Sequence, residues 1–125
     1  MNLNQVTIHS DKVAETVEFF RTLGLELIVD SRPRYARLLC PDGDSTLSVE
    51  YSQDPAQSGP ITLYFECENL DETVAALKKN GVVFSDDPTD KTWLWRESYL
   101  LDPNNNRICL FYAGENRKNP PWRVK

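Results

Sequence analysis

The chain of 125 residues is poor in the side chains that most often carry out chemistry. It has one histidine, His9, and its three cysteines form no C-x-x-C pair. It also has no G-x-G-x-x-G or Walker phosphate-binding sequence. The odd number of scattered cysteines argues against a disulfide framework, and the missing glycine motifs argue against a nucleotide-binding loop. A serine or cysteine nucleophile would have almost no choice of base, because only one histidine is present.

Long apolar runs are missing as well. No stretch approaches the ~20 residues that a membrane-spanning helix needs, and the first residues, MNLNQVTIHSD, have neither the basic nor the apolar region of a signal peptide. We therefore expect a cytoplasmic protein that does not enter a membrane. With 40% hydrophobic and 26% charged residues, the composition is typical of a globular protein, and the length suits a single domain over residues 1–125.

The formal net charge of −5 is unevenly distributed. Residues 113–125 carry four basic and one acidic side chain, or +3, which leaves −8 for the first 112 residues. An acidic body does not attract nucleic acid through phosphate contacts, so we expect no nucleic-acid partner. Such a body would attract a cationic small molecule or the basic C-terminal segment, although the charge also simply favours solubility.

Apolar residues at helical spacing occur twice, at a constant offset. The first stripe is Val13, Val17 and Phe20, and the second is Leu70, Val74 and Leu77. Gly24 and Gly81 follow the stripes, where a left-handed C-cap would end each helix, and 81 − 24 gives the same offset of 57 as the stripes. The matching stripes and caps predict an internal duplication.

Segments rich in strand-forming residues surround each predicted helix in the same order. They are residues 5–9, 25–29, 35–40 and 46–51 in the first half, and 61–67, 82–84, 93–101 and 107–112 in the second. Each half therefore predicts the order β-α-β-β-β. The polar stretch 53–60, with two prolines and a glycine, predicts the joint between modules 3–52 and 61–112, and a tail follows over 113–125.

A tandem βαβββ unit resembles the vicinal oxygen chelate superfamily, which includes glyoxalase I, extradiol dioxygenases, fosfomycin resistance proteins and bleomycin-binding proteins. The phrases that carry the resemblance are VAETVEFFRTLGLEL, LDETVAALKKNGVVF and YLLDPNNNRICLF, and the last is similar to the family's D-P-D-G-N-x-I-E-L signature. The likeness covers residues 3–112 and specifies the fold better than the activity. It implies an α+β fold in which two βαβββ modules form one curved, roughly eight-stranded mixed sheet with an open cleft, and it implies a homodimer.

Metal-dependent members of the family hold their ion in that cleft with four side chains from the first and last strands of the modules. Carried over to this chain, the positions fall on Gln5, Thr62, Cys109 and, in a register that Ser48 leaves uncertain, Glu50. A threonine hydroxyl and a lone thiol are poor partners for a divalent ion. The resemblance therefore implies no bound metal here, and Gln5 and Glu50 would be the ligands if one bound.

Residues 92–100, TWLWRESYL, predict a strand with an unusual aromatic face. Strand alternation places Trp93, Trp95, Glu97 and Tyr99 on that face. Two interpretations stay open. The aromatics pack under a helix or at a dimer seam, or they form a wall that stacks on a planar or cationic ligand, with Glu97 supplying charge.

The remaining polar side chains have ordinary interpretations beside the functional ones. His9 shares a strand face with Gln5, where a lone histidine is more often a surface residue than a general base. Arg37 and Arg96, if they face inward, would hold a carboxylate or phosphate group, whereas surface salt bridges are their commoner fate. The predicted residues of the ligand cleft are Gln5, Thr7, Glu50, Thr62, Tyr64, Trp95, Arg96 and Cys109.

We predict a metal-independent protein without a cofactor that binds a small molecule, similar to the family's drug-binding and bleomycin resistance members. Aromatic rings would supply contact area, and Glu50 or Glu97 would supply charge. Two alternatives stay open. One is a metal-dependent lyase, isomerase or dioxygenase of the glyoxalase type, and the other is a dimeric interaction module.

The C-terminal segment generates the first testable prediction. Residues 116–124, NRKNPPWRV, combine two prolines that stiffen the chain with Trp122, which has the surface to anchor it. We predict that this segment docks on the acidic body of its own chain or of a partner. Removing residues 116–125 should lower the melting temperature by several degrees or change the oligomer size in gel filtration. A truncated chain that keeps both properties would contradict the docking.

Overall fold

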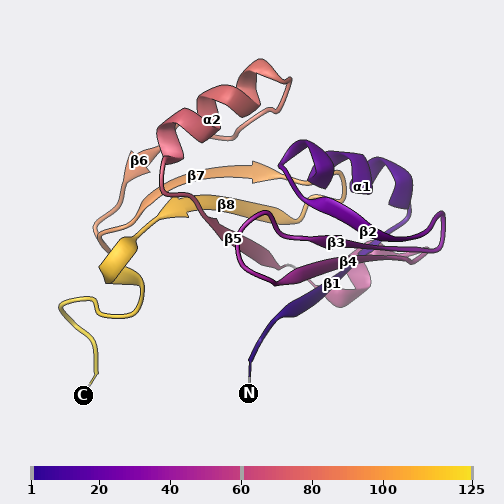
Figure 1. The fold of residues 1–125 in the computed structure, drawn as a ribbon, viewed down its shortest axis with the longest axis horizontal. Coiled ribbons are helices and arrows are strands. Elements are labelled where there is room, and N and C mark those ends of the chain that lie inside the picture. Colours follow the sequence, from indigo (N-terminus) through magenta and orange to yellow (C-terminus); the bar gives the residue numbers. More distant parts are fainter. Residues whose placement is uncertain (1, 60, 125) are drawn as a thin grey trace. The chain divides into compact units, whose positions relative to one another are not determined.

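Two modules with the same order of strands and helix follow each other in the computed structural model of the protein, which describes residues 2–59 and 61–124 (Figure 1). The α+β class and the two predicted βαβββ modules are confirmed. The eight strands pair as two four-stranded mixed sheets, one in each module, instead of one continuous sheet. This arises because the first strand of each module lies beside the last strand of the same module.

The first module comprises β1 (Gln5–Ser10), α1 (Val13–Thr22), β2 (Glu26–Ser31), β3 (Tyr35–Leu39) and β4 (Thr46–Tyr51). Its sheet has the order β1-β4-β3-β2. β1 and β4 are parallel, and their register places Thr7 opposite Ser48. The antiparallel pairing of β3 with β4 places Arg37 on the other side of Ser48.

The short helix η1 (Pro55–Ser58) leads to the second module, which comprises β5 (Thr62–Glu66), α2 (Leu70–Lys79), β6 (Thr89–Asp90), β7 (Arg96–Leu101) and β8 (Arg107–Tyr112). A second short helix, η2 (Gly114–Arg117), follows. The sheet has the order β5-β8-β7-β6, and β5 is parallel to β8. Tyr64 and Tyr99 lie opposite Cys109 on its two sides.

The two α-helices repeat each other closely. Both have ten residues, and their first residues, Val13 and Leu70, are 57 apart. Gly24 and Gly81 follow them with φ angles of 104° and 90°, which glycine adopts without a steric penalty. Neither of these two α-helices of the described chain has the length and apolarity to cross a membrane.

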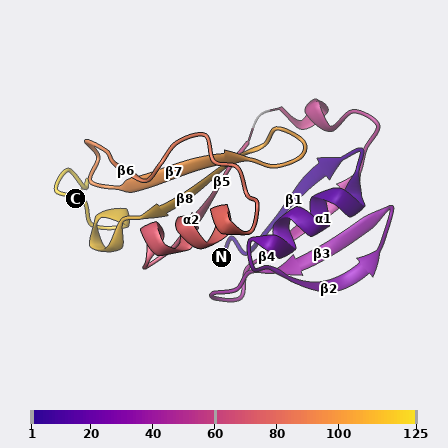
Figure 2. The same ribbon diagram turned by 90° about the horizontal axis from the view of Figure 1, so that it is seen from above.

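Each α-helix packs on a face of its own sheet. α1 contacts β2, β3 and β4, and Figure 2 shows it lying across them, while α2 contacts β8. The buried side chains in the first module include Ile8, Val17, Phe20, Leu38 and Val49, each at most 2% exposed. Those in the second include Val74, Leu100 and Ile108, also at most 2% exposed. The helix stripes read from the sequence are therefore the core.

The chain divides into two compact units. The first unit contains the first module together with the turn Asp102–Asn105, and the second contains the rest of the second module and the C-terminal segment. Asn104 Nδ2 donates a hydrogen bond of 3.0 Å to Thr16 Oγ1 of α1, and Asp102 is 4% exposed and accepts the backbone N–H of Asn104 at 2.8 Å. The turn Asp102–Asn105 thus contributes to the packing of the first unit.

Two predicted strands differ from the structure. Residues 82–84 are not a strand. Tyr99 of β7 is met instead by Ser85, whose N–H donates to the Tyr99 carbonyl at 2.7 Å, and by Asp86 Oδ1, which accepts the N–H of Tyr99 at 2.7 Å. On the edge away from β8, the strand that pairs with β7 is the two-residue β6. The strand expected over 93–101 begins only at Arg96, because Leu94 has a φ of 68° and ends a turn.

The C-terminal segment is attached through an acidic side chain of β5. Glu66 Oε2 accepts the backbone N–H groups of Ala113 and Gly114, both at 2.9 Å, and Arg117 Nε lies 3.4 Å from Glu66 Oε1. Trp122, the expected anchor, is 58% exposed. Within the chain, Glu66 holds the start of the segment and Trp122 does not anchor it.

Gly81 allows the backbone contribution to stability to be tested alone. A methyl group added at Gly81 would meet no atom within 4 Å, so Gly81→Ala adds only the strain of a left-handed residue. We expect a loss of about 1–2 kcal/mol of unfolding free energy, measured by urea denaturation. Lys79→Ala, on the exposed last turn of α2, is the control and should change it by less than about 0.5 kcal/mol. Equal losses in the two variants would contradict the strain.

Candidate functional site

Each sheet has one face that its own helix does not cover. Strand alternation and the observed registers assign the side chains to this helix-free face. In the first module these are Gln5, Thr7 and His9 of β1, Tyr35 and Arg37 of β3, and Ser48 and Glu50 of β4. In the second they are Thr62, Tyr64 and Glu66 of β5, Glu97 and Tyr99 of β7, and Arg107, Cys109 and Phe111 of β8. Seven of the eight predicted cleft residues lie on these two faces or, for Trp95, beside one of them.

The helix-free face of the first sheet carries a chain of hydrogen bonds centred on Ser48. Its hydroxyl lies 2.7 Å from the Tyr35 phenol oxygen and accepts a bond of 3.3 Å from Gln5 Nε2. Arg37 Nε donates to the same phenol oxygen at 3.0 Å, and the guanidinium lies 5.7 Å from the centre of the Tyr35 ring. The Ser48 bond, followed by the Arg37 bond, lowers the pKa of Tyr35 against the opposing effect of burial.

Arg37, one of the two strand arginines named from the sequence, is half-buried on the helix-free face of the first sheet. Its Nε donates the hydrogen bond to Tyr35, and no ion pair to Arg37 occurs among the described residues. Arg96, the other candidate, pairs opposite Tyr112 on the other face of its sheet. Its guanidinium contacts Asp71 of α2 at 2.8 Å and Asp90 at 3.0 Å. Arg96 therefore joins α2 to its sheet and is not on the helix-free face.

Gln5 and Glu50 do not fit a shared metal site. Gln5 lies opposite Thr46 and Glu50 opposite His9, so the two side chains are four residues apart on paired strands, or about 13 Å. Two ligands of one ion lie within about 5 Å of each other. Both ends of the Gln5 amide are also engaged, with Ser48 at 3.3 Å and Thr46 at 3.0 Å. Among residues 2–59 and 61–124, no three His, Cys, Asp or Glu side chains form a metal-binding group.

Cys109 corresponds to Ser48 and not to Glu50. Tyr64 is 57 residues after Thr7, and it lies opposite Cys109 as Thr7 lies opposite Ser48. The sequence left the register open between Glu50 and Ser48, and the strand pairing matches Ser48 to Cys109 and Glu50 to Phe111. The reason is length: the offset from Ser48 to Cys109 is 61, so the second module has four more residues between its helix and its last strand.

The helix-free face of the second sheet is aromatic. Trp95 stacks on Phe111 with a centroid distance of 4.4 Å and an interplanar angle of 13°. Tyr64 meets both rings edge-on, at 6.0 and 5.9 Å, and is 53% exposed. Trp95 and Tyr99 pack against the buried Cys109 and Phe111. We call Tyr64, Trp95, Tyr99 and Phe111 the aromatic face.

Cys109 lies at the base of the aromatic face. The thiol is 0% exposed, and burial, followed by the charge of Glu97, raises its pKa to about 12. A thiol with so high a pKa is protonated at neutral pH and is a weak nucleophile and metal ligand. Cys109 therefore serves the packing of this face. Thr62 lies further along β5, opposite Arg107.

Two contacts on these faces were not indicated by the sequence, that of Ser48 with Tyr35 and that of Trp93 with Glu97. Ser48 and Tyr35 are neither charged nor part of a motif, so only the strand register reveals that they meet. Trp93 was expected in a strand but lies in a turn, and its indole N–H nevertheless reaches Glu97 Oε2 at 2.7 Å. A Trp-x-x-x-Glu spacing alone gives no signal for this contact.

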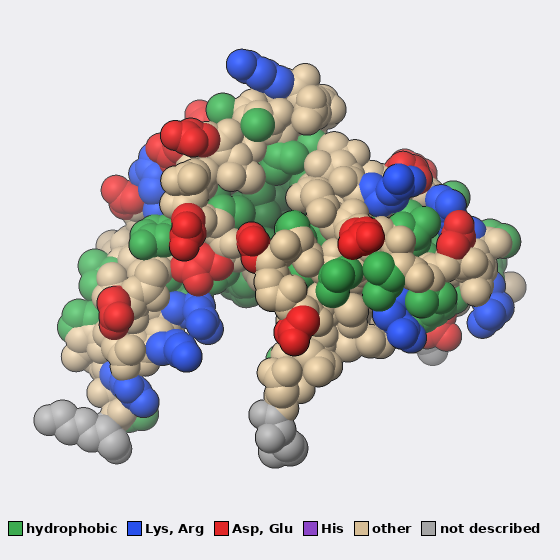
Figure 3. Space-filling model, viewed as in Figure 1, with side chains coloured by type: hydrophobic (Ala, Val, Ile, Leu, Met, Phe, Trp, Pro, Cys, Tyr) green, Lys and Arg blue, Asp and Glu red, His purple; other side chains and the backbone are tan. Residues whose placement is uncertain are grey.

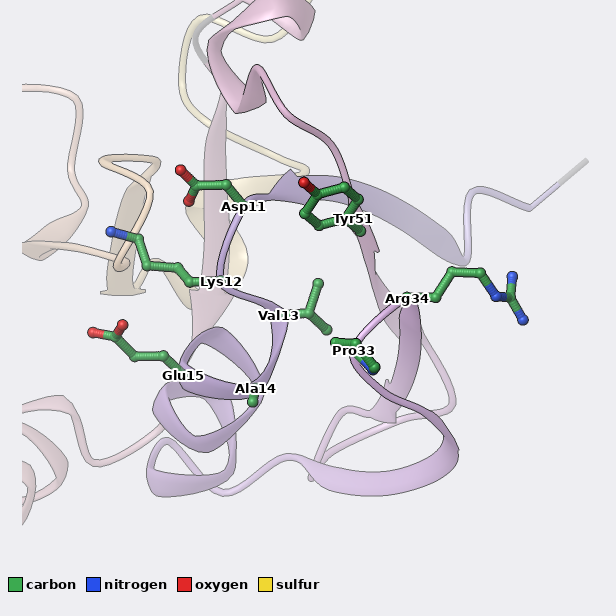
Figure 4. Close-up of a pocket in the computed structure, with 8 residues that line it drawn as sticks. All are labelled: Asp11, Lys12, Val13, Ala14, Glu15, Pro33, Arg34 and Tyr51. Atoms are coloured by element: carbon green, nitrogen blue, oxygen red, sulfur yellow. The ribbon is translucent and has the colours of Figure 1, made fainter.

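A shallow apolar pocket of about 490 Å³ lies elsewhere in the first unit, at the start of α1. Figure 4 shows that the charged groups of Asp11, Lys12 and Glu15 point outward from it, and so does that of Arg34. Its lining is otherwise Val13, Ala14, Pro33 and Tyr51. No residue of the predicted cleft lines this pocket.

Acidic and basic side chains are mixed over the surface shown in Figure 3, and several basic ones gather near the C-terminal end. Arg117, Lys118 and Arg123 of the C-terminal segment are all exposed. The charge asymmetry of the sequence thus falls on an exposed segment after the last strand.

The repeated modules and their two helix-free faces define a protein of the tandem βαβββ class. The chain belongs to the Glyoxalase/Bleomycin resistance protein/Dioxygenase superfamily, whose family model matches residues 2–110. The resemblance to the vicinal oxygen chelate superfamily is therefore confirmed. No curated protein matches the chain.

Solved structures show the same fold at low sequence identity. A glyoxalase/bleomycin resistance protein/dioxygenase from Nocardioides is similar with a TM-score of 0.79 and 18% identity, over 100% of this chain and 90% of that one. A lactoylglutathione lyase from Agrobacterium tumefaciens gives 0.76 and 14%, over 90% and 93% of the two chains. TioX from Micromonospora sp. ML1 gives 0.73 and 15%, over 90% and 99%. At such identities the likeness shows the fold alone.

The buried thiol of Cys109 makes the free energy of unfolding depend on pH in the alkaline range. Because the pKa of Cys109 rises from 9.0 to about 12 on folding, the unfolded chain loses its proton first, and stability falls as the pH rises from about 9 towards 12. Burial raises the pKa of Tyr99 as well, with the same sign. Urea unfolding at a series of pH values gives the slope of the unfolding free energy against pH. In Cys109→Ala this slope should be shallower than in the wild type, by up to about 1.4 kcal/mol per pH unit. Val83→Ala, which removes no titrating group, should keep the wild-type slope; a wild-type slope in Cys109→Ala would contradict the assignment.

Proposed function

We propose that the protein binds a flat small molecule, without a metal ion, on the aromatic face of the second sheet. The observation that carries this proposal is the stack of the half-buried Trp95 on the buried Phe111, with Tyr64 at its edge and 53% exposed. Aromatic rings on a rigid sheet offer a large contact area at a small entropic cost, because few side-chain angles remain to be ordered. A planar ligand would extend the stack.

The position of these residues supports binding over a purely structural role. They lie on the face that α2 does not cover, so the core under that helix does not require them. Small-molecule sites in proteins are mostly apolar and aromatic with a few polar groups. Membership in the superfamily, which contains proteins acting on small molecules, points the same way.

The metal-dependent alternative has less support. It relied on Gln5 and Glu50, which the strand register places about 13 Å apart. We therefore assign no catalytic step to this chain. The homodimer stays a prediction from the resemblance, as does the dimeric interaction module.

A ligand screen tests the proposal directly. Flat aromatic compounds should raise the melting temperature in buffer containing EDTA, because a ligand at 100 times its Kd adds about 2.7 kcal/mol to the unfolding free energy. Tyr64→Ala and Trp95→Ala should weaken binding by about tenfold or more, since stacking on one ring contributes about 1–3 kcal/mol. Trp122→Ala removes an exposed ring outside the aromatic face and is the matched control.

Two outcomes would refute the proposal. One is a screen in which no flat compound stabilises the protein. The other is binding that needs added Zn²⁺, Ni²⁺, Fe²⁺ or Mn²⁺, which would instead favour the metal-dependent alternative.

A further inference from the structure

Glu97 is a buried acidic side chain whose hydrogen bonds are only half made by the protein. It is 2% exposed and lies on β7, on the helix-free face of the second sheet. Its Oε2 accepts the indole N–H of Trp93 at 2.7 Å. Its Oε1 is buried and has no hydrogen-bond partner in the described structure. An ionised carboxylate accepts up to about four hydrogen bonds, and a buried charge without a partner is strongly unfavourable.

No basic side chain of the described residues forms an ion pair with Glu97. Arg107 on the neighbouring strand lies 4.6 Å from the centre of the Tyr99 ring. Burial first, and the nearby Glu97 carboxylate as a further cause, raise the pKa of both Tyr99 and Cys109. Both groups therefore stay neutral at physiological pH. Within residues 2–59 and 61–124, the Glu97 carboxylate is therefore in contact with neutral side chains and with no cation.

Trp93 supplies its hydrogen bond from a turn and not from the sheet. It lies just before Leu94, which has a φ of 68°, and its side chain is 45% exposed. A half-exposed side chain on a turn moves away at a smaller cost than one held in a core. The indole N–H is only a donor. The indole of Trp93 therefore occupies the position at Glu97 Oε2 that an N–H donor of a ligand would take.

The aromatic face adjoins this carboxylate. Glu97 lies directly opposite Phe111 in the β7–β8 pair, and Phe111 is the ring on which Trp95 stacks. A ligand seated on these rings with a donor at its edge would meet both surfaces at once.

This inference rests on the proposed function and specifies its ligand. We propose that Glu97 is the charged recognition group of the aromatic face, that the ligand is a flat aromatic molecule bearing a protonated nitrogen with at least one N–H, and that Trp93 covers the carboxylate until this ligand displaces its indole. The unpartnered Oε1 requires a donor as well as a charge. A quaternary ammonium, which has no N–H, leaves that oxygen unpartnered.

Three probes with the same indole ring separate these requirements. Tryptamine carries a primary ammonium group, tryptophol carries a neutral hydroxyl in its place, and N,N,N-trimethyltryptammonium keeps the charge without an N–H. In calorimetric titrations at pH 7, wild-type protein should bind tryptamine about tenfold or more tighter than the other two, because a hydrogen bond to a charged group has that effect.

Variants assign the selectivity to its residues. Glu97→Gln removes the charge with little change in shape, and the three probes should then bind within about threefold of one another. Trp93→Phe keeps an aromatic ring but removes the indole N–H, so tryptamine should bind several-fold tighter while tryptophol stays unchanged. Glu72→Gln, an exposed carboxylate on α2, is the charge control and should keep the wild-type pattern.

Each outcome decides between the two proposals. Equal binding of tryptamine and tryptophol to the wild-type protein overturns the role of Glu97 but leaves binding on the aromatic face intact. The role of Glu97 is also overturned if Glu97→Gln still prefers tryptamine, or if the wild-type protein binds tryptamine and the trimethyl compound equally. Weaker tryptamine binding in Trp93→Phe overturns the covering role of Trp93. If none of the three indoles binds, the recognition by Glu97 is overturned, whereas the aromatic binding face is overturned only if the screen of flat compounds fails as well.

Discussion

The packing of one amphipathic helix on one face of each four-stranded sheet is the constraint on which the rest of the structure depends. α1 and α2 bury side chains from alternate strand positions, such as Val49 and Ile108. Because successive residues of a strand point to opposite faces, this fixes which side chains remain on the helix-free face. A slip of one residue in the register would exchange the two sets. The candidate site is therefore a consequence of the same register that forms the core.

The two modules use this common scaffold for different chemistry. On the first sheet, Ser48, Tyr35 and Arg37 form a hydrogen-bonded chain that ends in a guanidinium with no ion pair among the described residues. On the second sheet, the corresponding region is aromatic and includes the buried carboxylate of Glu97. A duplicated backbone needs to preserve only its helix stripe, caps and strand alternation, so the helix-free side chains of the two copies were free to diverge. The replacement of Ser48 by Cys109 at matched positions is one example.

Buried polar groups in this protein follow two patterns. Asp102 and Asn104 are embedded in the first unit and bond to each other and to Thr16, as expected for groups that stabilise a turn. Glu97 Oε1 and Asn104 Oδ1 are both buried without a hydrogen-bond partner among the described residues, but Glu97 is an acidic side chain, whereas Asn104 is a neutral amide. An incompletely compensated charge destabilises the fold, and such departures from complete pairing are concentrated at functional sites. This difference distinguishes the Glu97 region from the structural polar groups.

The sequence by itself determined the two helices, their glycine caps, the 57-residue repeat and the family, because these depend on local periodicity and on spacing along the chain. It also determined that residues 92–100 carry aromatic rings and a carboxylate. Only the tertiary structure decided that Cys109 matches Ser48, that Arg96 faces α2, and that Gln5 and Glu50 are far apart. Those facts depend on loop lengths and on the hydrogen-bond register between distant strands, and a contact such as that of Asp86 with the N–H of Tyr99 leaves no local signal in the sequence. Burial of Glu97 belongs to the same group, since it arises from residues brought together across strands and turns and not from its neighbours in the chain.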